Sequence, residues 1–282
     1  MRIAVSHLTR LDFGEEVTES VMDARLGPRD DAHQRVRRFQ VRLEPGGHVR
    51  RYEDGFGNAA HLLTSMRPHT FLQVIAETEI QTSLVDPFQL PAQPPRPLDA
   101  IERLDYLDDS PLVPPLPVVR DMAAPFRPRD AEAAFDAVRG LAEMIYRSFA
   151  YRQNVTDVTT SIDQVIEGRQ GVCQDFAHVL IGLCRAIDIP ARYASGYIVP
   201  QSHGDDDRTP SRGAGASHAW IEAFTPTHGW RGFDPTNNLV ANEHYVKVAI
   251  GRDYHDVAPT RGTYHGTPGE RLTVAVDVHA LD

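Results

Sequence analysis

The stretch Gln170-Gly-Val-Cys-Gln-Asp-Phe-Ala177 introduces an apolar helix that begins beside a cysteine. Gly171 marks a break in the backbone, and apolar residues then recur at helical spacing as far as Asp188. Cys173 therefore falls in the first turn of the predicted helix. The unpaired amide N–H groups and the helix dipole favour negative charge there, which promotes the nucleophilic thiolate. A small buried core cysteine is the alternative that this segment alone leaves open.

Two further segments predict a β-hairpin that brings a histidine and an aspartate together. Ser217-His-Ala-Trp-Ile-Glu-Ala-Phe224 and Gly229-Trp-Arg-Gly-Phe-Asp-Pro-Thr236 flank a five-residue turn centred on Thr227. This register pairs Phe224 with Trp230, Glu222 with Gly232 and Trp220 with Asp234. His218 then lies one step further along, diagonal to Asp234 on the same face and within reach of its carboxylate. A slip of one residue would place the two side chains on opposite faces.

Cys173, His218 and Asp234 together have the chemistry of thiol-dependent acyl transfer. One ring nitrogen of the histidine would exchange a proton with the thiol, while the other donates to the aspartate, which stabilises the imidazolium. Taken singly, a strand histidine and a turn-forming aspartate before Pro235 have ordinary structural explanations, but the coincidence of all three favours catalysis. Cys184 lies in the middle of the same helix, with no base nearby, and is expected to be structural.

Four motifs place these residues in a recognisable context. They are Gly171-Val-Cys-Gln-Asp-Phe-Ala-His178, Ile189-Pro-Ala-Arg-Tyr-Ala-Ser-Gly-Tyr197, Ser217-His-Ala-Trp220 and Gly232-Phe-Asp-Pro-Thr-Asn237. In this combination and order the motifs resemble the bacterial transglutaminase-like superfamily, strongly over residues 161–238. More loosely, segments 17–20, 25–28 and 54–58 resemble the N-terminal β-domain of many bacterial members. The resemblance implies a papain-like α+β core with Cys173, His218 and Asp234 as the triad.

Strand patterns and proline content predict where the domains divide. Residues 1–98 are β-rich, with strands at 36–42 and 70–82 between glycine-containing turns, and predict a small antiparallel sandwich or barrel. Eleven of the 21 prolines lie between residues 86 and 128, so residues 99–128 are expected to be a linker with one short helix at 100–107.

Residues 129–282 are expected to form the catalytic domain. Helices are predicted at 130–150 and 172–188, followed by strands at 191–199, 218–224, 230–234 and 272–279. Helices that precede an antiparallel sheet indicate an α+β fold.

The overall composition limits the partners. The chain has 282 residues and a formal net charge of −10, which argues against nucleic acid or anionic lipid, because phosphate binding needs a concentrated basic surface. No apolar stretch approaches the roughly 20 residues that cross a bilayer, and the N-terminus lacks the apolar segment of a signal peptide. A cytoplasmic protein is expected, in keeping with two free cysteines. The oligomeric state stays open.

Other side chains are candidates for the oxyanion hole or the cleft. The backbone N–H of Cys173 is the expected first oxyanion donor, with Gln174, Gln170 or Trp220 as a side-chain donor. Trp220 and Tyr197 could wall a substrate groove, although a core role is the alternative for at least one of them. No cofactor is expected.

No metal site is expected either. The run Asp205-Asp-Asp207 is interpreted as a solvated loop rather than a calcium site, because adjacent carboxylates repel and liganding spacing is absent. The histidines and cysteines do not follow zinc spacing.

Three functions are compatible with these features. Attack by Cys173 on a peptide or glutamine amide would give a thioester, which water resolves by hydrolysis and an amine resolves by cross-linking. Hydrolysis is favoured, because nothing in the sequence indicates a site that binds an amine and excludes water. A cysteine protease or amidase acting on a protein or peptide is thus expected, with a transglutaminase as the first alternative. A peptide-binding or protein-binding module without catalysis is the second.

Overall fold

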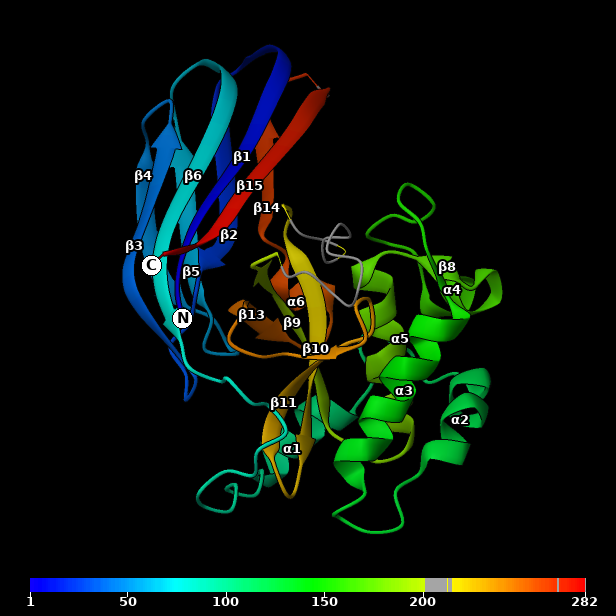
Figure 1. Cartoon of the computed structure of the whole chain (residues 1–282). Coiled ribbons are helices and arrows are strands. Elements are labelled where there is room, and N and C mark those ends of the chain that lie inside the picture. Colours follow the sequence, from blue (N-terminus) through cyan, green and yellow to red (C-terminus); the bar gives the residue numbers. More distant parts are fainter. Residues whose placement is uncertain (201–211, 213–214, 268, 282) are drawn as a thin grey trace.

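A computed structural model describes residues 1–200, 212, 215–267 and 269–281. A β-sandwich packs beside a mixed helix-and-sheet core, so the fold is α+β as expected (Figure 1). Among the described residues, no helix has the length and apolar character needed to cross a membrane.

Two four-stranded antiparallel sheets form the sandwich. Their strands are β1 (Arg2–Val17), β2 (Glu19–Gly27), β3 (Gln34–Glu44), β4 (His48–Glu53), β5 (Ala59–Ser65), β6 (His69–Thr82), β14 (Thr260–His265) and β15 (Glu270–Leu281). The sheet orders are β15-β1-β6-β3 and β14-β2-β5-β4. Apolar side chains from both sheets, such as Val17, Leu63 and Val74, form the core between them. The structure thus selects the sandwich over the barrel.

The two C-terminal strands correct the expected domain boundary. β15 pairs with β1 from Arg2–Leu281 to Phe13–Glu270, and β14 pairs with β2. In Figure 1 the C-terminal strand β15 accordingly lies beside β1. Residues 260–281 therefore belong to the sandwich and not to the catalytic domain of 129–282. The strand expected at 272–279 exists, but its hydrogen-bond partner lies about 270 residues away along the chain, where local patterns carry no signal.

The rest of the chain forms the helix-and-sheet core. Its helices are α1 (Ala100–Leu107), α2 (Pro117–Ala123), a 3₁₀ turn (Ala124–Phe126), α3 (Ala134–Ser148), α4 (Ile162–Gly168), α5 (Cys173–Ala186) and α6 (Tyr254–Val257). Its main sheet has the order β12-β11-β10-β9-β13. These strands are β9 (Ala191–Ile198), β10 (His218–Thr225), β11 (Gly229–Asp234), β12 (Leu239–Val240) and β13 (Tyr245–Gly251), and the short β7 (Ala150–Tyr151) and β8 (Gln170–Gly171) pair separately.

Helix α5 is the centre of this core. Ten of its fourteen residues are buried, and it contacts α2, α3 and α4 as well as the sheet through β9 and β10. Ala219, Ile221 and Ala223 form the face of β10 that belongs to the same apolar core. The helix ends at Ala186, and the backbone of Asp188, two residues further, adopts the left-handed conformation (φ 64°).

The sandwich caps the free edge of the main sheet at β13. The Gln34 side chain accepts a hydrogen bond from Lys247 N (3.0 Å) and donates one to Lys247 O (2.7 Å). The buried Asn58 amide makes the same pair of bonds with Ile250, at 2.8 and 2.7 Å. Two side-chain amides thus replace a neighbouring strand, because buried backbone donors and acceptors require partners.

Candidate active site

Cys173 is the first residue of α5 and is partly exposed. At this position the first backbone N–H groups of the helix have no partner within the helix, and they point toward incoming negative charge. Cys184 is fully buried, and burial raises the pKa of its thiol. The two cysteines thus occupy the environments expected from their places in the helix.

Asp175 fixes the start of this helix. Its Oδ2 accepts hydrogen bonds from the backbone N–H of Val172 and from the Thr156 hydroxyl, both at 2.7 Å. Burial raises the pKa of Asp175, and these two bonds oppose the rise. A Cβ at Gly171 would stand 2.6 Å from the same Oδ2, so only glycine fits before the turn. The glycine that marks the break in the sequence therefore has a steric reason.

His218 begins β10 and binds Asp234 at the end of β11. Its Nε2 donates to Asp234 Oδ2 at 2.8 Å, and both side chains are fully buried. The hairpin register is the predicted one where pairing is recorded: Phe224 lies opposite Trp230 and Glu222 opposite Gly232. The expected diagonal contact between the imidazole and the carboxylate is present.

The other nitrogen of the ring is directed to the thiol. His218 Nδ1 is buried and makes no hydrogen bond of good geometry within the described part of the chain. Burial lowers the pKa of His218, but the charge of Asp234, its hydrogen bond and the nearby Cys173 thiol outweigh burial and raise the pKa to about 10. Catalytic hydrogen bonds are commonly long before substrate binds. The raised pKa favours the charged form of the ring, which lies between a carboxylate and a sulfur.

Asp234 is held by more donors than the sequence predicted. Oδ2 accepts from the Tyr245 hydroxyl (2.9 Å) and from Asn237 Nδ2 (2.8 Å), and Oδ1 accepts from Thr236 N (2.9 Å). Burial alone would raise the pKa of Asp234, but the charge and hydrogen bond of His218 and the hydrogen bonds from Asn237 and Tyr245 lower it. The carboxylate therefore stays ionised although water does not reach it.

An aromatic pair supports the histidine from behind. The Trp220 ring stacks on His218, with centroids 6.1 Å apart and planes 23° apart, and Tyr245 meets Trp220 edge-on at 5.3 Å. Trp220 is only 2% exposed, so it packs behind the imidazole and is not an open groove wall. This support restricts the rotation of the imidazole.

Two other sequence candidates take structural positions. Tyr197 is 2% exposed, and its hydroxyl bonds His7 Nδ1 of β1 at 2.8 Å, so it joins the sandwich to the sheet. Of the two alternatives for Tyr197, the structure favours the core role over the cleft wall, because its side chain faces β1. The Gln174 amide donates to Val158 O at 3.5 Å, and it remains a candidate oxyanion donor. Gln170 lies in β8, on the path into α5.

Sequence reasoning did not assign a role to Tyr245 or Asn237. Asn237 stands inside the Gly232–Asn237 motif, three residues after Asp234, so its position was a usable signal. Tyr245 is the first residue of β13, and no pattern in the neighbouring sequence indicates that its hydroxyl reaches Asp234.

No metal centre is present in the described ranges. Within them, no group of three or more His, Cys, Asp or Glu side chains is arranged to hold a metal ion. The run Asp205–Asp207 lies outside the described residues.

Comparison with known proteins identifies the family of the chain. Residues 120–235 match the transglutaminase-like superfamily, and residues 3–81 match the bacterial transglutaminase-like N-terminal region. Uncharacterised proteins of Mycobacterium tuberculosis and Mycobacterium leprae are each 32% identical, over 98% and 99% of this chain and 92% and 99% of their own length. A Cytophaga hutchinsonii structure described as a candidate cysteine protease has the same fold, with a TM-score of 0.78, 23% identity and coverage of 100% and 91%. The chain belongs to the transglutaminase-like superfamily and carries the N-terminal region of its bacterial members.

Proposed function

We propose that the protein is a cysteine protease or amidase that hydrolyses amide bonds of a protein or peptide through Cys173, His218 and Asp234. One observation supports this proposal above the others: a fully buried His218–Asp234 hydrogen bond whose free ring nitrogen is beside the thiol at the start of α5. Members of the superfamily are typically enzymes. A structural histidine would not need this arrangement of a buried carboxylate and a partly exposed thiol.

Each residue has a defined role in the proposed reaction. The thiolate of Cys173 attacks the carbonyl carbon, and the backbone N–H groups at the start of α5 stabilise the oxyanion. The C–N bond breaks as the His218 imidazolium gives its proton to the departing amine, which leaves a thioester. His218 then takes a proton from water, whose oxygen attacks the thioester and releases the acid. Asp234 keeps the ring oriented and stabilises its charged form.

Mass spectrometry of a glutamine-containing peptide tests the proposal. The peptide is incubated with the enzyme, with and without a primary amine, and the products distinguish backbone cleavage, deamidation and amine addition. Cleavage or deamidation that persists in the presence of the amine is expected. The Cys173→Ala variant should give no product, whereas the Cys184→Ala variant should remain active.

Each other outcome identifies another function. Amine adducts that dominate over hydrolysis would make the protein a transglutaminase. Peptides that bind without being converted, in the wild type and in Cys173→Ala alike, would indicate a binding module.

A further inference from the structure

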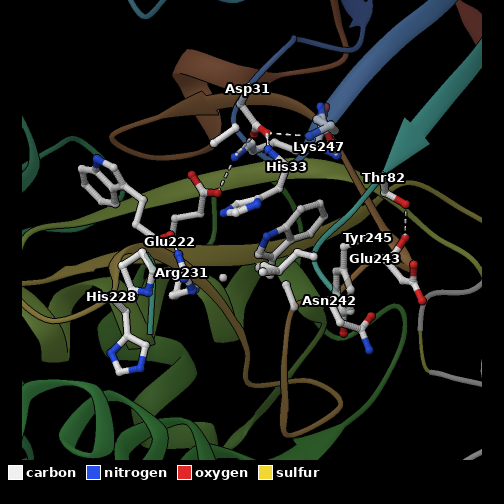
Figure 2. A pocket seen from close by; sticks show the side chains of 18 of the residues that line it. Asp31, His33, Thr82, Glu222, His228, Arg231, Asn242, Glu243, Tyr245 and Lys247 are labelled. Carbon is white, nitrogen blue, oxygen red and sulfur yellow. Dashed lines mark hydrogen bonds and ion pairs between the residues drawn. The ribbon is translucent and has the colours of Figure 1, made fainter. Parts of the chain in front are cut away.

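A cavity of about 340 Å³ lies between the main sheet and the sandwich-side segments that pack against it. Its floor is formed by β10, β11 and β13, and its walls come from the β2–β3 loop, the end of β6 and the segment 84–95 that follows β6. Figure 2 shows these side chains around the cavity. The volume is within the usual range for small-molecule sites.

Most charged groups in the cavity wall are already paired. Glu222 binds Lys247 through one oxygen and Arg192 through the other, at 2.5 and 2.6 Å. Lys247 also binds Asp31 at 2.7 Å. Burial would raise the pKa of Glu222, but the two cations outweigh burial and lower the pKa to about 2. Glu243 pairs with the amino group of Met1 at 3.2 Å.

Arg231 differs from these groups because no carboxylate in the described chain pairs with it. Its side chain is 5% exposed, and its hydrogen bonds go to the carbonyls of Pro87, Gln89 and Trp230 at 3.2–3.4 Å. These bonds use three of the five N–H donors of the guanidinium. Burial lowers the pKa of Arg231, while the nearby charge of Glu222 opposes the change. A buried cation without an ion-pair partner is costly, so an anion is the ligand that this wall favours.

The remaining walls are mainly apolar, with His33, Gln34, Thr82, His228 and Asn242 as further polar lining residues. Trp220, Trp230, Tyr245, Leu84, Pro91 and Pro95 line the cavity. Such surfaces favour a ligand with a compact apolar body, whereas a single uncompensated cation matches a single negative charge. A multiply charged phosphate compound fits this combination poorly. The walls and the charge together indicate an organic acid.

The cavity also lies directly behind the candidate triad. Trp220 stacks on His218, and Tyr245 donates to Asp234, yet both residues line the cavity with their other surfaces. A ligand in the cavity would contact the residues that support the histidine and the aspartate. Cys173 is not among the residues that line the cavity, so the cavity is distinct from the site of the thiol.

We propose that this cavity binds a small apolar monocarboxylate, whose carboxylate pairs with Arg231 and whose apolar body packs against Trp220 and Tyr245. Phenylacetate is a suitable probe, and phenylacetamide has the same shape without the charge. Isothermal titration calorimetry of the full chain should show that the acid binds at least about tenfold more tightly than the amide, because a charge-assisted bond is lost in the amide. Quenching of Trp220 and Trp230 fluorescence should follow the same binding curve.

Substitutions locate the site. The Arg231→Gln variant should bind phenylacetate at least about tenfold more weakly, and Arg231→Lys should recover part of the affinity. Arg147→Gln, at an exposed position of α3, should bind as the wild type does. Because Arg231 also binds the carbonyls of Pro87 and Gln89, circular dichroism must show that its variants are folded. Leu84→Trp, at a partly exposed wall position, provides a second variant that should block the cavity.

Three results would overturn the proposal. They are equal affinity for phenylacetate and phenylacetamide, unchanged binding in folded Arg231→Gln or Leu84→Trp, and no saturable binding of phenylacetate, indole-3-acetate or hexanoate up to about 10 mM. Calorimetry measures binding without turnover, so this proposal and the proposed hydrolytic function are tested separately.

Discussion

At the scale of single residues, the charge of Asp234 determines the protonation of His218. The buried ring has a pKa of about 10 because the carboxylate outweighs the effect of burial. In Asp234→Asn this charge is absent while burial remains, so the pKa of His218 falls. The active imidazolium should then be lost at a lower pH, and kcat should drop by about 10³-fold or more.

The pH dependence of kcat/KM measures this effect. In the wild type the activity should persist above pH 8 and fall as the pH rises through about 10. In Asp234→Asn the basic limb should shift to lower pH. If kcat/KM falls over the same basic pH range in both proteins, the Asp234 carboxylate does not control the pKa of His218.

Tyr245 is predicted to act through Asp234. Its hydroxyl donates to Oδ2 at 2.9 Å and helps to lower the pKa of that carboxyl. In Tyr245→Phe the pKa of Asp234 should rise, so the carboxylate is protonated at higher pH and the acid limb of kcat/KM moves upward. A decrease of about tenfold in kcat/KM is expected, the scale of one hydrogen bond to a charged group.

A surface tyrosine provides the matched control for this change. The Tyr264 hydroxyl donates to Glu270 at 2.6 Å on the exposed edge of the sandwich. Tyr264→Phe should leave both limbs of the pH profile unchanged. If the pH profile of Tyr245→Phe is the same as that of Tyr264→Phe, Tyr245 does not position Asp234.

The geometry of the three main site residues was predictable because each lies in a local pattern. Gly171 precedes the helix of Cys173, and the short turn before Gly229 sets the register that brings His218 to Asp234. Tyr245 and the real position of Tyr197 were not predictable, because each depends on contacts with distant segments.

At the scale of elements, local signals were sufficient for α5, α1 and the β10–β11 hairpin. The helix expected at 130–150 begins at Ala134 instead, since Asp130 accepts a hydrogen bond from Ala133 N in the turn that precedes it. The strands β1, β2 and β13 were missed. β13 is defined by its pairing with β9 and by two side chains from the sandwich, and neither is visible in its own sequence.

Asn58 should be essential for the edge of β13. Its buried amide satisfies both backbone groups of Ile250. Asn58→Ala leaves a buried donor and a buried acceptor without partners, which should lower the free energy of unfolding by about 2 to 4 kcal/mol. Urea denaturation measures the loss, with exposed Gln40→Ala as the control that should stay within about 0.5 kcal/mol of the wild type. Equal losses in the two variants would contradict the capping role.

At the scale of the whole molecule, the chain ends inside the domain in which it begins. β14 and β15 are edge strands of the two sandwich sheets, and the sandwich in turn contacts β13. The pairing of β15 with β1 and of β14 with β2 could not be predicted, because strands so far apart along the chain leave no local sequence pattern. It implies that the sandwich and the core unfold together.

A chain shortened to residues 1–258 tests this coupling. It lacks both outer strands and exposes the unpaired backbone edges of β1 and β2, so it should be aggregated or lack a cooperative thermal transition. A chain ending at Ala280, which keeps nearly all of β15, should melt as the full chain does. Size-exclusion chromatography and circular dichroism distinguish the two. Cooperative melting of the shorter chain at the full-length temperature would show that the core is independent.

The central claim is that His218 activates Cys173 for nucleophilic attack. Alkylation by iodoacetamide at pH 6, followed by peptide mapping with mass spectrometry, measures this activation directly in the wild type and in His218→Gln. Cys173 should be modified in the wild type at least about tenfold faster than in the variant, and buried Cys184 should stay unmodified in both. Equal rates for Cys173 in the two folded proteins, or equally slow modification of both cysteines, would contradict the account.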